Sequence, residues 1–121
     1  MSIAINDNAP LRQIPAAQPF RSAEAAWFWC MGILQARRDG VGASFGTQRQ
    51  VCEPDDVVMT LDRLYRQRRI DLAHARILRV YGERGCAPDH AKPQERADQR
   101  LWREAMDRLG QALKGRGIVQ P

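Results

Sequence analysis

Apolar residues recur at intervals of three and four along most of this 121-residue chain. Such spacing places them on one side of a helix. The pattern predicts four helices, over residues 23–38, 54–68, 72–83 and 94–113. The residues at the boundaries agree: Ser22 and Asp71 suit a capping position, Pro54 suits a first turn, and Gly85 suits the residue after a helix. We therefore expect an all-α fold.

The first predicted helix is apolar on every side in its middle, AAWFWCMGIL. A helix of this kind must be surrounded by protein. It is therefore either the central helix of the fold or a helix that meets another chain with part of its surface. Trp27, Phe28 and Trp29 are consecutive and cannot all face one core, so they are candidates for an interface with a protein partner or with a second copy in a homodimer.

The spacing also predicts which side of each later helix faces the core. Predicted core positions are Val57, Val58, Leu61, Leu64 and Tyr65 in the second helix, Ala73, Ile77, Val80 and Tyr81 in the third, and Ala97, Leu101, Trp102, Ala105, Leu109 and Leu113 in the fourth. Charges on the fourth helix are expected to pair one turn apart, Arg100 with Glu104, Glu104 with Arg108 and Arg103 with Asp107.

A chain of this length has room for one domain. We expect a disordered tail at residues 1–19, and a helical domain at 20–117 built as a three-helix core plus the N-terminal apolar helix. For residues 118–121 we expect a frayed end, with a short strand as the alternative. Residues 39–53 carry three glycines and read as a connection. The start lacks a secretory signal, and the longest apolar run is about half of what a membrane-spanning helix needs, so a soluble cytoplasmic protein is expected.

Residue types that carry catalysis or bind metals are sparse. Cys30, Cys52 and Cys86 form no CxxC pair, which fits a reducing compartment. A zinc site would have to combine the last two cysteines with His74 and His90, which lie on separate predicted elements. We expect isolated thiols and surface histidines instead, without a cofactor. No GxSxG, glycine-rich phosphate loop or HExxH occurs, so an enzyme is not expected.

Positive charge is concentrated in residues 62–85, DRLYRQRRIDLAHARILRVYGERG. Seven arginines against three acidic residues give this segment +4 of the chain's formal +5. A polyanion is the partner that such a concentration favours. The chain holds only two lysines among its nineteen basic residues, which fits selection for bidentate phosphate contacts but equally fits a GC-rich genome. Arginine is therefore informative only where it clusters.

Two helices joined by a short link and followed by a third are the minimal parts of a helix-turn-helix unit. Candidate phosphate contacts are Arg63, Arg66, Arg68, Arg69, Arg76, Arg79 and Arg84, and candidate base-reading residues on the fourth helix are Gln94, Arg96, Gln99, Arg100 and Arg103. We expect a DNA- or RNA-binding regulatory protein. Two alternatives stay open: solvated faces of an arginine-rich bundle, and a non-enzymatic adaptor or inhibitor that uses the aromatic residues of the first helix.

A resemblance points the same way. ARILRVYGERG followed by PQERADQRLWREAMDRL, within residues 75–109, resembles the first and last helices of sigma-factor region 4 or of a phage antiterminator-type helix-turn-helix. The resemblance implies transcription regulation by a phage-derived protein. The chain departs from that pattern where CAPDHAKP replaces the short middle helix. The segment from CEPDDVV to LDRLYRQRRIDLAHARILR also resembles small bacterial proteins of unassigned function, which implies no activity.

Overall fold

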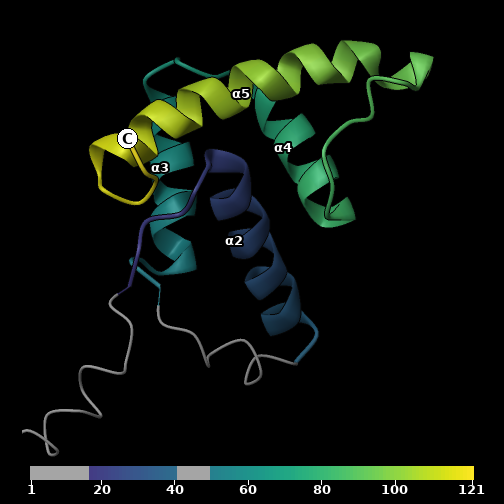
Figure 1. Cartoon of the computed structure of the whole chain (residues 1–121). Helices are drawn as coiled ribbons and strands as arrows, with labels where there is room; N and C mark the ends of the chain where they lie inside the picture. The colour runs from purple at the N-terminus through teal and green to yellow at the C-terminus, as the bar shows by residue number, and fades with distance from the viewer. Residues whose placement is uncertain (1–16, 41–49) are drawn as a thin grey trace, which may run out of the picture.

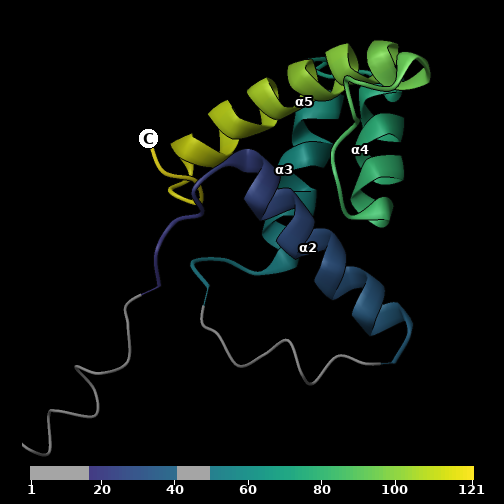
Figure 2. The same ribbon diagram turned by 45° about the vertical axis from the view of Figure 1, so that its right-hand side comes forward.

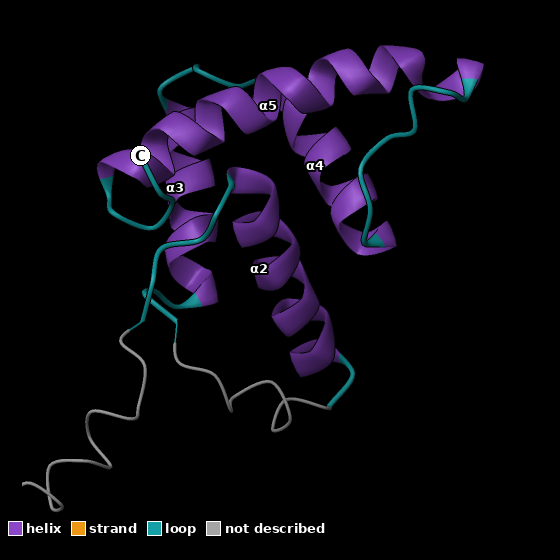
Figure 3. Cartoon of the chain, in the orientation of Figure 1, coloured by secondary structure: helices purple, strands orange, loops and turns teal. Residues whose placement is uncertain are grey.

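Helices make up the regular structure of this protein (Figure 3). The computed structural model describes residues 17–40 and 50–121. Its elements are α2 (Ala23–Arg38), α3 (Pro54–Arg66), α4 (Leu72–Arg84), a short 3-10 helix η2 (Pro93–Glu95) and α5 (Arg96–Gly115). The predicted all-α fold and its four helices are confirmed, and the described residues contain no strand beyond one isolated bridge. The sequence bounds were right to within two residues.

Local hydrogen bonds set these bounds. Ser22 accepts a hydrogen bond from the N–H of Ala25 at 3.1 Å and thereby caps α2. Asp71 accepts from the first N–H groups of α4, and Gly85 ends that helix at φ 85°, in the left-handed region that favours glycine. Between α4 and η2 the chain is irregular, as CAPDHAKP indicated. Element boundaries are therefore encoded by neighbours in sequence.

The apolar helix α2 is the central helix of the fold. It packs against α3, α4 and α5, and α5 crosses the end of the molecule at which α2 begins (Figures 1 and 2). Ala26 and Cys30 on α2 have no exposed surface. The central position is observed for one side of α2, and contact of its partly exposed side with another chain stays a prediction.

The aromatic run of α2 is used inside the protein. The Trp27 side chain is buried, and its Nε1–H donates to the carbonyl oxygen of Leu78 at 2.9 Å. Phe28 stacks on Trp102 with ring centroids 5.6 Å apart, and Trp29 packs on Phe20 at 5.0 Å. The expected partner interface is therefore wrong for Trp27, and Phe28 and Trp29 are partly buried against the chain's own core. Each of the three consecutive aromatics therefore contacts another part of the chain, although two of them keep part of their surface exposed.

The core face of α3 is rotated from its predicted position. Val58 and Tyr65, both predicted in the core, are 38% and 46% exposed. Thr60 is buried instead, at 2% exposure, and its hydroxyl donates to the carbonyl oxygen of Asp56 at 2.7 Å. A hydroxyl that bonds to the preceding turn can be buried at little cost. Hydropathy alone does not predict that a threonine is buried at this position.

Two of the four core positions predicted on α4 are buried. Ile77 and Tyr81 are buried, whereas Ala73 is exposed and Val80 is 47% exposed. Their places in the core are taken by residues that sequence reasoning left out, namely His74, Leu78 and Gly82. On α5 the predicted face holds for Trp102, Ala105, Leu109 and Leu113, which are buried; Leu101 is partly buried and Ala97 is exposed.

The C-terminal residues are held by the N-terminal segment. Ile118 and Val119 are buried, and Phe20 and Val119 form an isolated parallel bridge. The Phe20 N–H donates to the Ile118 oxygen at 2.8 Å, and the Gln120 N–H donates to the Phe20 oxygen at 2.9 Å. The expected frayed end is therefore wrong for Ile118 and Val119. The expected tail and the 39–53 connection mostly concern residues 1–16 and 41–49, which lie outside the described residues.

A close approach of α2 and α4 at Gly82 gives a first prediction. A Cβ atom on Gly82 would lie 2.8 Å from both Trp27 Nε1 and Met31 Cγ. We expect Gly82→Ala to lower the free energy of unfolding by roughly 1–3 kcal/mol through overpacking. Thermal and urea unfolding followed by circular dichroism would measure the change.

Gly32→Ala is the matched control, because a Cβ atom there meets nothing within 4 Å. It gains the same helix propensity without a clash, so we expect about 0.5–1 kcal/mol of added stability. Equal effects of the two substitutions would contradict the close packing of α2 on α4.

Candidate nucleic-acid interface at the α3–α4 turn

The turn between α3 and α4 contains a strained arginine. Arg68 has φ 61°. Its N–H donates to the Tyr65 oxygen at 3.0 Å, and the N–H of Arg69 donates to the Leu64 oxygen at 2.9 Å. These two bonds form the Schellman motif, in which the left-handed residue is usually glycine. For a residue with a Cβ this conformation costs about 1–2 kcal/mol.

A buried histidine ties the turn to α5. The His74 ring accepts the N–H of Asp71 at Nδ1 (3.1 Å), so Nε2 carries the proton and donates to Glu104 at 3.0 Å. The bond from His74 lowers the pKa of the Glu104 carboxyl. His74 is 6% exposed, so the expectation of a surface histidine was wrong. Its polar atoms are satisfied by a capping bond on one side and a carboxylate on the other, which is why it can be buried.

An open hollow of 450 Å³ lies beside this turn, and we call it the turn hollow. It is lined by Tyr65, Arg66, Arg68, Ile70, Asp71 and Leu72. Tyr65 and Leu72 are large side chains that stay 46% and 60% exposed, whereas Ile70 is buried at 3%. Apolar and cationic side chains therefore share one exposed concavity.

Four arginines of the turn are exposed, and we call them the turn arginines. They are Arg63, Arg66, Arg68 and Arg69. Arg66 is paired with Asp62. Across residues 17–40 and 50–121, no carboxylate forms an ion pair with any of the other three. The nearby Asp71 carboxylate accepts N–H groups at the start of α4, where the helix dipole already favours a negative charge. The turn thus keeps an excess of positive charge.

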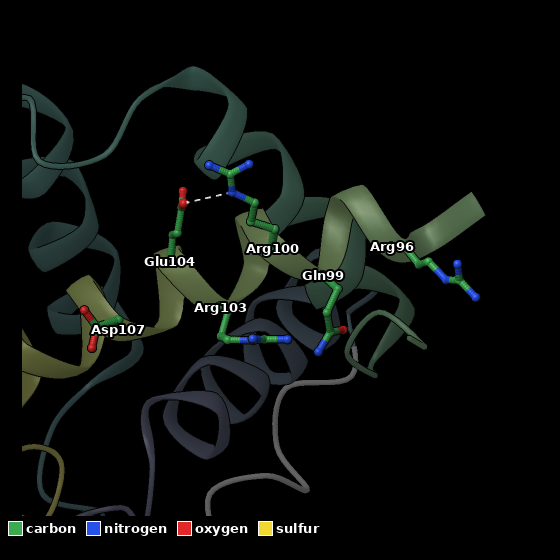
Figure 4. A pocket seen from close by; sticks show the side chains of 6 residues that line it. All are labelled: Arg96, Gln99, Arg100, Arg103, Glu104 and Asp107. Atoms are coloured by element: carbon green, nitrogen blue, oxygen red, sulfur yellow. Dashed lines mark ion pairs between the residues drawn. The ribbon is translucent and has the colours of Figure 1, made fainter. Parts of the chain in front are cut away.

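The predicted base-reading residues occupy a different surface. A second open hollow, of 620 Å³, is lined by Arg96, Gln99, Arg100, Arg103, Glu104 and Asp107 (Figure 4). Arg100 and Glu104 lie on one side of α5 and pair at 3.5 Å; Arg103 and Gln99 lie on another. Of the three predicted ion pairs of this helix, the one between Arg100 and Glu104 forms, whereas Glu104 turns its other oxygen to His74. Two carboxylates in the hollow reduce its attraction for an anion.

The remaining candidates are dispersed. Arg76 and Arg79 are exposed on α4, and Gln94 is exposed in η2. Arg84 donates to both carboxylate oxygens of Glu95, at 3.1 and 3.0 Å, and lies 4.4 Å from the centre of the Tyr81 ring. Arg84 is therefore committed to a structural ion pair, and its expected phosphate contact is not supported.

The structure thus places Arg66 and Arg68 in one hollow at the turn, with Arg63 and Arg69 exposed nearby in the sequence, whereas the α5 group lines a different hollow. Sequence reasoning missed Tyr65 and Leu72 as surface residues. Tyr65 sits at the edge of the apolar stripe of α3, and an amphipathic side chain at such an edge often has an exposed end. Leu72 gave no comparable signal.

The chemistry of the cysteines gives no indication of a reactive site. All three are free, and Cys30 is buried. Burial raises the pKa of the Cys30 thiol to about 12 and that of Cys52 to about 11, so both are protonated at neutral pH. Among the described residues there is no cluster of three metal-ligating side chains. Nor does that part of the chain hold a helix with the length and apolarity to cross a membrane.

The strain at Arg68 can be tested by substitution. We expect Arg68→Gly to raise the free energy of unfolding by about 0.5–1 kcal/mol. Glycine relieves the strain of the left-handed backbone, but it also makes the unfolded chain more flexible, which offsets part of that stabilisation. Arg69→Gly removes the same charge at a residue without a positive φ and should lower stability by a similar amount. Chemical unfolding of both variants measures this. A stabilising Arg69→Gly together with a destabilising Arg68→Gly would contradict the turn geometry.

The Glu95 ion pair predicts a dependence of stability on pH. The hydrogen bonds from Arg84, and the N–H of Asp89 at 2.7 Å, lower the pKa of the Glu95 carboxyl from 4.5 to about 2. The ionised Glu95 side chain contributes fully to the free energy of unfolding above the pKa that this carboxyl has in the unfolded chain. This contribution is lost as the pH falls from 4.5 toward 2. Melting temperatures measured across this range should fall more steeply for the native chain than for Glu95→Gln. Equal slopes would rule out this carboxylate as a source of acid sensitivity.

No family model, curated protein or solved structure matches this chain. The resemblance of residues 75–109 to helix-turn-helix proteins stays a prediction. The arrangement of the turn arginines is what supports a function for this protein.

Proposed function

We propose that this protein is a small, non-enzymatic nucleic-acid-binding protein that contacts DNA or RNA through the α3–α4 turn. The observation that carries the proposal is the cluster of four exposed turn arginines, three of which form no ion pair with a described carboxylate. Their guanidinium groups match phosphate oxygens in a bidentate manner. Four exposed arginines within residues 63–69 give this part of the surface a positive charge that attracts a polyanion.

The expected mode of binding follows from the same geometry. Phosphate contacts fix the position of the protein on a strand but carry no sequence information. Each contact also releases counterions, so affinity must fall steeply with salt. Reading of bases by α5 has weaker support, because Glu104 and Asp107 share its hollow with the arginines. The proposal is therefore one of salt-dependent binding that tolerates many sequences.

The alternative of an adaptor or inhibitor acting through α2 has weaker support, because it rests on side chains that are only partly exposed. Trp27 is buried, and Phe28 and Trp29 pack on Trp102 and Phe20. For a homodimer the available surface on these residues is the part of Phe28 and Trp29 that stays exposed. A role in transcription regulation rests on the sequence resemblance alone.

The proposal predicts a change in the salt dependence of binding. We expect Arg63→Gln/Arg69→Gln to lower the slope of log affinity against log salt by about 0.7–0.9 for each phosphate that the variant no longer neutralises. Fluorescence anisotropy with labelled duplex and single-stranded oligonucleotides, from low to physiological salt, measures the slope.

The charge-matched control is Arg37→Gln/Arg38→Gln, at the end of α2 away from α5 (Figure 1). It changes the net charge equally and should leave the slope close to that of the native chain. If the native chain bound no oligonucleotide at low salt, or bound without salt dependence, the proposal would be wrong. Equal reductions of the slope in the two double variants would exclude the turn as the contact.

A further inference from the structure

We infer that the turn hollow stacks an unpaired nucleobase, so the preferred ligand is a single-stranded nucleic acid whose phosphates meet the turn arginines. This inference rests on the function proposed above and goes beyond it by naming the state of the strand. It starts from Tyr65 and Leu72, which are about half exposed and line one hollow, whereas Val58, Met59 and Val80 are exposed to a similar extent but are not among its lining residues. Exposed apolar surface gathered in one concavity marks a binding site.

The composition of the hollow favours a base and its phosphate. Tyr65 offers an aromatic ring, and Leu72 and the buried Ile70 add apolar surface. Arg66 and Arg68 line the same hollow. Stacking on aromatic side chains combined with a basic surface is how single strands are held without regard to sequence. In a duplex the faces of the bases are stacked on one another and are not available to a side chain.

The size of the hollow agrees with this occupant. Its volume of 450 Å³ falls within the range of about 300–1,000 Å³ that is typical of small-molecule sites. It is open to solvent, which a strand that enters and leaves requires. The Asp71 carboxylate is the acidic group lining it, and the Ala73 and His74 N–H groups already occupy one of its oxygens. Of the two arginines that line the hollow, Arg66 is paired with Asp62, so Arg68 is the one that forms no ion pair with a described carboxylate and is placed to meet a phosphate.

Arg68 adds an independent observation. An arginine occupies the left-handed position at which a Schellman motif usually has glycine. Strained residues of this kind cluster at ligand sites, where the strain fixes the direction of a side chain. Here the strained backbone sets the direction in which a guanidinium leaves the turn, and that side chain lines the hollow together with Tyr65.

The test compares ligands that differ only in their bases. An oligothymidylate strand, an abasic deoxyribose-phosphate strand of the same length and a duplex are titrated against the full chain by fluorescence anisotropy at fixed salt. We expect the single strand to bind more tightly than the abasic strand by at least about fivefold, since stacking contributes roughly 1–3 kcal/mol per base. This comparison needs no variant and is independent of any folding defect.

Variants then locate the base. Tyr65→Ala should weaken binding of the single strand by at least about fivefold and leave binding of the abasic strand unchanged. Tyr65→Phe keeps the ring and should retain native affinity. Met59→Ala is the matched control, because Met59 is a 55% exposed residue of α3 outside the residues that line the turn hollow, and it should have no effect.

The results separate this inference from the proposed function. Equal affinity for the thymidylate and abasic strands, or equal weakening of both by Tyr65→Ala, would overturn base stacking but leave salt-dependent phosphate binding intact. Tighter binding of the duplex would overturn it in the same way. If polyglutamate of matched charge bound as well as the thymidylate strand, the hollow would be a site for acidic peptides instead. If none of the nucleic acids bound, both the inference and the proposed function would fall.

Discussion

The rest of the structure depends on the burial of the side of α2 that carries Ala26, Trp27 and Cys30. α3, α4 and α5 pack on that side because only protein can remove so much apolar surface from solvent, whereas Phe28, Trp29 and Leu34 stay partly exposed. Gly82 permits the close approach of α4 to α2, since Trp27 and Met31 occupy the space that a Cβ atom would take. The Nε1–H of Trp27 is satisfied by a backbone oxygen of α4, so burial leaves no polar group of this side chain unpaired.

Two polar ties between side chains add to the apolar packing of the helices. His74 bridges Asp71 and Glu104 and so fixes the α3–α4 turn against α5. Arg84 and Glu95 fix the connection between α4 and α5 at the other end of α4. Both ties involve α4, which also packs extensively on α5. They hold the turn in one place, and this leaves the turn arginines and Tyr65 exposed on a fixed backbone.

Prediction from the sequence succeeded where the determinants were local. Ser22, Asp71 and Gly85 mark helix ends through bonds to residues within one turn, and the bounds of the helices followed from them. Prediction failed for residues whose side chains can lie either in the core or at the surface. Thr60 is buried because its hydroxyl bonds to its own helix, and Tyr65 moves outward as a result of the rotation. The candidate site was half foreseen, since the arginines were named and the aromatic beside them was assigned to the core.

The sequence by itself determined the helices, the concentration of arginine between residues 62 and 85 and the need to surround the first helix with protein. Periodicity and capping act over a few residues, so they can be read without a structure. Only the tertiary structure decided that Arg84 is locked to Glu95, that Arg100 shares its surface with Glu104, and that three turn arginines form no ion pair with the described carboxylates. Pairing of charges depends on which helix faces come together, and that is set by the packing of the whole core around α2.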